Sequence, residues 1–152
     1  MRAETASARE ALQWRIAVCV LWLSIGLYLF SLSGIAVCLD PGECQRGWVA
    51  LAFGWVGVSR VEDLAWFANP LLIFGWLLAP SGARFLSGPF CVAPLLISGA
   101  FLFATKVVGP GEGGFREADL VSIGSGYWLW LASIAMAVVA AMLFPRSKLQ
   151  WP

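Results

Sequence analysis

Long apolar runs separated by short polar segments dominate the pattern of this chain. Four of these runs contain no charged residue. About 20 apolar residues are needed for a helix to cross the hydrocarbon core of a bilayer. The pattern therefore predicts four transmembrane helices, at about 16–37, 62–79, 85–105 and 120–144.

The second predicted span begins at a capping signal and contains a proline. Ser59 followed three residues later by Glu62 matches a capping box. Pro70 removes one backbone hydrogen bond and kinks the helix, so a neighbouring group must satisfy the freed carbonyl. Asn69 is the most polar side chain at depth. We expect it to bond that carbonyl or to bridge to another helix; the alternative is that it lines a small polar pocket.

A fifth apolar segment, 47–58, is too short to cross a bilayer. It contains 12 residues and lies between Arg46 and Arg60. Trp48 and Trp55 are typical anchors at the membrane–water interface. The pattern predicts an interfacial or re-entrant helix in the first outer loop. The second outer loop, 106–119, is rich in Gly and Pro, and we expect it to be flexible.

These elements together predict the fold class. We expect an all-α integral membrane protein, with residues 1–152 forming a single membrane domain. Its four helices would form an up-down bundle, because short connections place consecutive helices antiparallel. Small residues spaced along the fourth span would allow close helix packing.

Composition agrees with membrane insertion and narrows the chemistry. The chain is 60% hydrophobic and 12% charged, against about 25% charged for soluble domains. A net charge of +1 gives no reason to expect a nucleic-acid partner. The sequence contains no histidine, which excludes imidazole metal ligands, Ser-His-Asp triads and His-ligated haem. We therefore expect no metal and no cofactor.

The distribution of Lys and Arg predicts the orientation. Six of these residues face the cytoplasm if both termini are inside, and four then lie outside. The inside set is Arg2, Arg9, Arg15, Arg84, Arg146 and Lys148, and the outside set is Arg46, Arg60, Lys106 and Arg116. We expect N- and C-termini in the cytoplasm and, from size and simplicity, a bacterial inner membrane.

Two cysteines flank a turn in the first outer loop. Asp40-Pro41-Gly42 folds the chain back between Cys38 and Cys44, so the two could reach disulfide distance. Such a disulfide would be a structural clip or a redox-active pair. We expect the remaining cysteines, Cys19 and Cys91, to be buried small apolar residues.

Four spans with a cysteine pair in the first outer loop resemble the quinone-linked membrane thiol oxidases. The resemblance implies thiol–disulfide oxidoreductase activity at Cys38 and Cys44. Two features depart from that family's pattern. The spacing is Cys-x5-Cys instead of Cys-x-x-Cys, and the second outer loop has no cysteine.

Aromatic residues gather at the predicted outer face. An aromatic belt accounts for them, since Trp and Tyr place an apolar ring in lipid and a polar tip in water. The alternative is an interaction surface for a partner or a quinone-type ligand. Its residues would be Trp48, Trp55, Trp66, Tyr127, Trp128 and Trp130.

Three functional classes remain open. The first is a non-enzymatic accessory or interaction protein, surrounded by the lipid bilayer and contacting a membrane protein partner or a second copy. The second is the oxidoreductase. The third is a small channel or transporter, which is disfavoured because ion-coupled transport needs an ionisable group at depth and the four spans have none.

Overall fold

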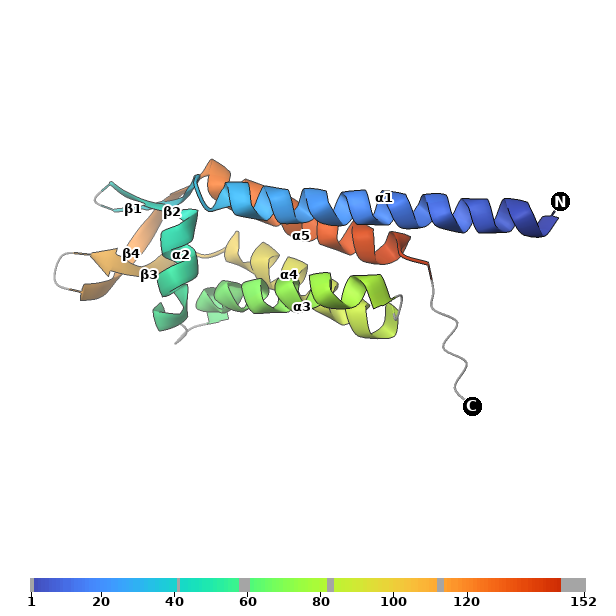
Figure 1. Ribbon diagram of the computed structural model, residues 1–152. Coiled ribbons are helices and arrows are strands. Elements are labelled where there is room, and N and C mark those ends of the chain that lie inside the picture. The colour runs from blue at the N-terminus through green and yellow to red at the C-terminus, as the bar shows by residue number, and fades with distance from the viewer. Residues whose placement is uncertain (1, 41, 58–60, 82–83, 112–113, 146–152) are drawn as a thin grey trace.

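The structure is a bundle of helices with a small sheet at one end (Figure 1). This computed structural model describes residues 2–40, 42–57, 61–81, 84–111 and 114–145. Its four longest helices are α1 (Arg2–Ser31), α3 (Ala68–Leu78), α4 (Arg84–Phe101) and α5 (Ser125–Leu143). Short 3-10 helices flank α3, namely η2 (Val61–Phe67) and η3 (Ala79–Ser81).

The helices alternate in direction along the bundle. Figure 1 shows α1 and α4 running toward the sheet and α3 and α5 running away from it. The N-terminal end of α1 and the C-terminal end of α5 therefore lie at the end of the bundle opposite the sheet. The antiparallel arrangement of neighbours predicted from the sequence holds for these helices.

Four antiparallel strands form the sheet in the order β2-β1-β4-β3. They are β1 (Ile35–Leu39), β2 (Glu43–Arg46), β3 (Lys106–Gly111) and β4 (Gly114–Ile123). Between the sheet and the bundle, α2 (Gly47–Phe53) lies across the long axis of α1, and η1 (Gly54–Gly57) continues it (Figure 1). We call the four strands and α2 the cap.

The prediction of an all-α protein was wrong. Residues 35–37, placed in the first span, belong to β1, and residues 120–123, placed in the fourth span, belong to β4. Val37 pairs with Ile123 across these two strands. An apolar run indicates burial, but a short run does not distinguish helix from strand. The loop predicted to be flexible is also a hairpin, with Lys106 paired to Asp119.

The prediction of four spans was also wrong. Within the described residues, three helical segments are long and apolar enough to cross a membrane, namely Ala8–Ser31, Leu64–Ser81 and Ser125–Leu143. The described apolar part of α4, Ser87–Phe101, is shorter than a span requires. The chain turns directly after Phe101 and enters β3, so the apolar run to Thr105 does not lengthen α4.

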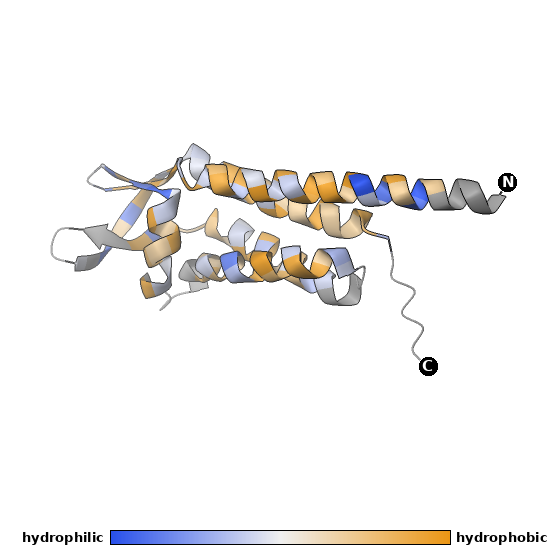
Figure 2. Ribbon diagram, viewed as in Figure 1, coloured by the Kyte–Doolittle hydropathy of each residue, from blue (hydrophilic) through white to orange (hydrophobic). Residues whose placement is uncertain are grey.

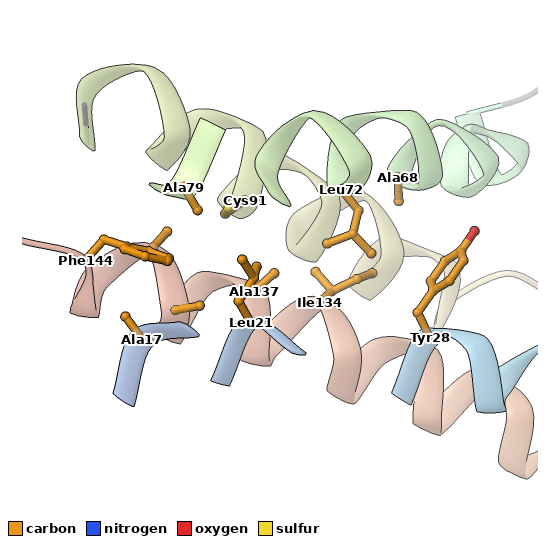
Figure 3. Packing of buried hydrophobic residues seen from close by; sticks show 12 residues of the cluster. Ala17, Leu21, Tyr28, Ala68, Leu72, Ala79, Cys91, Ile134, Ala137 and Phe144 are labelled. Carbon is orange, nitrogen blue, oxygen red and sulfur yellow. The ribbon is translucent and has the colours of Figure 1, made fainter. Parts of the chain in front are cut away.

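Apolar side chains from all four long helices meet in the centre of the bundle. Figure 3 shows Ala17 and Leu21 of α1, Leu72 of α3 and Ile134 of α5 pointing toward one another. Many of the buried residues are small, which allows the helices to approach one another closely. Hydrophilic residues lie toward the N-terminal part of α1 and in the sheet (Figure 2).

A junction of glycines joins the cap to the bundle. Gly34 follows α1, Gly47 begins α2, and Gly124 and Gly126 stand at the start of α5. A Cβ atom on any of them would lie at 3.0 Å or less from backbone atoms of a neighbouring segment. Backbone hydrogen bonds close the junction: Gly47 N–H donates to Gly34 O at 2.9 Å, and Gly124 N–H to Ala36 O at 2.8 Å. The cap is therefore held to the bundle by direct backbone packing.

Candidate functional site

An apolar pocket lies between the cap and the ends of the helices. Its volume is about 120 Å³. Its walls are formed by residues of α1 to α5, of the short helices η1 and η2, and of β1, β2 and β3. Aromatic side chains form much of the lining, from Phe53, Trp66, Phe101, Tyr127 and Trp130. Concave, mostly apolar sites with a few polar groups are the usual form of a binding site for a small molecule.

Asn69 organises the hydrogen bonds on the bundle side of the pocket. Its Oδ1 accepts from Tyr28 Oη at 3.2 Å and from Trp130 Nε1 at 3.0 Å, so it joins α1, α3 and α5. Its Nδ2 donates to the Trp66 carbonyl at 3.0 Å. That carbonyl lies four residues before Pro70, which has no N–H to offer it. Asn69 therefore bonds the carbonyl freed by Pro70 and also bridges between helices. It lines the pocket as well.

Trp66 fixes α2 over the pocket. Its indole Nε1 donates to the Leu51 carbonyl at 2.8 Å. Gly54, just after α2, faces the ring so closely that a Cβ there would lie 2.8 Å from Trp66 Cδ1. Because Trp66 also precedes α3 in the chain, this one side chain ties the pocket's outer wall to the bundle.

Tyr127 connects α5 with α4 on another side of the pocket. Its hydroxyl donates to the Ser98 carbonyl. Its ring stacks on Phe101 at 5.5 Å between centroids and contacts Trp130 at the same separation. The rings are in a buried cluster with Val37 and Leu39 of β1, so the sheet rests directly on these aromatic residues.

The side-chain nitrogen of Gln45, Nε2, is a buried hydrogen-bond donor without a protein partner among the described residues. Gln45 lies in β2 and lines the pocket. Leaving a buried donor unpaired costs about 1–3 kcal/mol. None of the residues that the structure describes around the pocket carries a charge, so the site is neutral.

The six aromatic residues singled out in the sequence fall into two sets. Trp66, Tyr127 and Trp130 line the pocket. Trp48, Trp55 and Trp128 are outside it and are 52%, 57% and 52% exposed. The suggested single interaction surface is therefore divided between an internal pocket and an outer surface.

Sequence reasoning missed Gln45 and Phe101 as pocket residues. Gln45 stands in what looked like an ordinary polar loop, and Phe101 within a uniformly apolar run. Neither carries a local signal, because each reaches the pocket only through the position of its element in the fold. Within β2, Gln45 alone is half-buried and its three neighbours are exposed, a difference that the pairing of β2 with β1 produces.

The cysteine pair lies in the cap, and neither cysteine lines the pocket. The predicted Cys38–Cys44 disulfide is confirmed, with the two Cα atoms 4.0 Å apart in directly paired positions of β1 and β2. Cys38 is half-buried and Cys44 is exposed. Cys91 is buried as expected, but the expectation that Cys19 is buried was wrong, because it lies on the exposed side of α1.

The candidate site is therefore an apolar pocket with the hydrogen bonds of Asn69 on its bundle side. A sheet whose strands β1 and β2 are joined by a disulfide lies on its cap side. Comparison of this chain with protein-family models, with curated proteins and with solved structures finds no match, so no family is assigned to it.

Proposed function

We propose that this chain is a non-enzymatic accessory protein of a membrane, which uses the outer surface of its cap to contact another membrane protein. The observation that carries the proposal is the exposure of three Trp side chains: Trp48 within the cap, and Trp55 of η1 and Trp128 of α5 in the segments that adjoin it. Trp is enriched among the residues that contribute most to binding energy at protein interfaces.

The proposed placement sets the bundle along the membrane normal with the cap outside. The three long apolar helices support insertion. In this placement α2 lies parallel to the membrane plane at the interface, because it crosses the axis of α1 (Figure 1). The shorter α4 lies beside the long helices in the bundle and returns the chain toward the cap, so that both termini lie on one side in this placement (Figure 1). The six-to-four distribution of Lys and Arg favours the cytoplasm for that side. We further propose a bacterial inner membrane as the location.

Rigidity of the cap supports a role in recognition. The disulfide joins β1 to β2, and Arg116 of β4 pairs with Glu43 of β2 at 3.7 Å across the intervening strand. A rigid surface loses little conformational freedom when a partner binds, so more of the contact energy becomes affinity. The edge strands β2 and β3 also offer unpaired backbone groups to an incoming strand.

Photo-crosslinking in native membranes tests this proposal. We expect p-benzoylphenylalanine at position 48, 55 or 128 to yield discrete adducts of defined mass, identified by mass spectrometry. Trp22 and Leu77 are matched controls, because both are exposed on the helical bundle, and they should crosslink only to lipid. An adduct of twice the chain's mass would identify a second copy as the partner. If positions 48, 55 and 128 crosslink only to lipid, as the controls do, the proposal is contradicted.

A thiol–disulfide oxidoreductase is the second candidate, favoured by the exposure of Cys44. We expect the Cys38–Cys44 disulfide to be structural, because two antiparallel strands hold its cysteines directly opposite each other. Differential alkylation across a glutathione series should then find it oxidised below about −300 mV. Reduction near about −200 mV with exchange onto a substrate thiol would favour the oxidoreductase instead.

A further inference from the structure

We infer that the pocket under the cap binds a neutral, membrane-soluble amphiphile through one carbonyl-type oxygen, which accepts a hydrogen bond from Gln45 Nε2. The site is separate from the outer surface proposed for partner contact. It is defined by the pocket's size, by its lack of charge and by Gln45 Nε2, the buried side-chain donor of its described lining that has no protein partner.

The size of the pocket limits what enters it. Its volume of about 120 Å³ is close to that of an apolar cavity that holds one benzene molecule, about 150 Å³. The pocket therefore has room for a compact head or the end of one chain, and the rest of a longer molecule must extend outside it. A whole two-chain lipid does not fit.

The donors and acceptors that the pocket residues leave unpaired define the chemistry of the ligand's polar head. Asn69 Oδ1 already accepts two hydrogen bonds, and the indole N–H groups of Trp66 and Trp130 both donate within the protein. Of the two buried side-chain atoms without a partner among the described residues, Gln45 Nε2 and Ser133 Oγ, only Gln45 Nε2 belongs to the pocket lining. Its complement is an acceptor such as a ketone or ester carbonyl oxygen.

The absence of charge among the described lining residues excludes an ionic head. A carboxylate or phosphate would leave water without gaining an opposite charge, which is strongly unfavourable. A molecule that is apolar except for one carbonyl partitions into the bilayer. The pocket lies where the cap meets the helix ends, which the proposed membrane placement puts near the headgroup boundary. The position of the pocket near the headgroup boundary depends on the membrane placement proposed above.

A pair of photoreactive probes tests the inference on the purified protein in lipid nanodiscs. One probe is a decan-2-one that carries an alkyl diazirine, and the other is the diazirine alkane of equal length without the carbonyl. We expect the ketone to label peptides containing Trp66 or Trp130 about five-fold more than the alkane does. One neutral hydrogen bond changes a binding affinity by about this factor. Gln45→Met, which keeps the side-chain length and removes the amide, should bring this ratio to about one.

Two further variants separate loss of the pocket from loss of the fold. Ala65→Leu fills the pocket and should reduce labelling by both probes, whereas Leu77→Ala, at an exposed position of α3, should leave both unchanged. Gln45→Met should retain labelling by the alkane if it is folded. Equal labelling of the wild-type protein by the two probes would overturn the inference, as would a ketone preference that persists in Gln45→Met. Neither result depends on whether positions 48, 55 and 128 crosslink to a partner.

Discussion

Gly126→Ala is expected to lower the free energy of unfolding by about 3 kcal/mol, the upper end of the usual range for overpacking. Gly126 is buried in the first turn of α5, where the cap joins the bundle. An added Cβ would lie 2.9 Å from Gly34 C, Ile35 O and Ser31 O. All three are backbone atoms, so no side-chain rotation relieves the contact and α5 must move away from the end of α1.

Gly26→Ala is the matched control. Gly26 lies within α1 and a Cβ there meets nothing within 4 Å. The substitution should be neutral or stabilising, because Ala is favoured over Gly in a helix by about 1 kcal/mol. Thermal unfolding of both variants in micelles, followed by circular dichroism, makes the comparison. Equal stability of the two variants would show that close packing at the glycine junction does not hold the cap in place.

Asn69→Leu is expected to leave membrane insertion intact and to lower the free energy of unfolding by about 2 kcal/mol. Insertion depends on the apolar length of the segment, which leucine increases. The substitution removes three hydrogen bonds, to Tyr28, Trp130 and the Trp66 carbonyl. Hydrogen bonds between helices in membranes contribute about 0.6 kcal/mol each, and the carbonyl that Pro70 leaves free loses its partner.

A double-mutant cycle apportions this effect. Tyr28→Phe and Trp130→Phe each remove one donor to Asn69 Oδ1, so each alone should cost less than Asn69→Leu. Combined with Asn69→Leu, Tyr28→Phe should add little, because its partner is already gone. Membrane fractionation reports insertion and unfolding in micelles reports stability. Loss of the Asn69→Leu protein from the membrane fraction, or full additivity with Tyr28→Phe, would contradict the assigned role.

Several features of this protein follow from local sequence. The charge-free runs predicted the centres of the three helical segments that can span a membrane, because the length of an apolar helix is a local property. The turn-forming sequence between Cys38 and Cys44 indicated that the two lie opposite each other, because two residues six positions apart around a turn have little freedom. The carbonyl freed by Pro70 likewise had to find a nearby donor, and the neighbouring Asn69 supplies it.

Other features were decided by tertiary structure. The apolar residues 35–37 and 120–123 could have continued their helices, and pairing between β1 and β4 made them strands. The two segments are far apart in sequence, so no local pattern reports that pairing. The pocket likewise requires Gln45, Trp66 and Tyr127 to come together from separate elements. Local composition is enough to show which segments are too apolar to be surrounded by water, because that property depends on each segment's own residues. How these segments pair their backbone groups, and which side chains meet, depends on contacts between distant parts of the chain and follows from the fold alone.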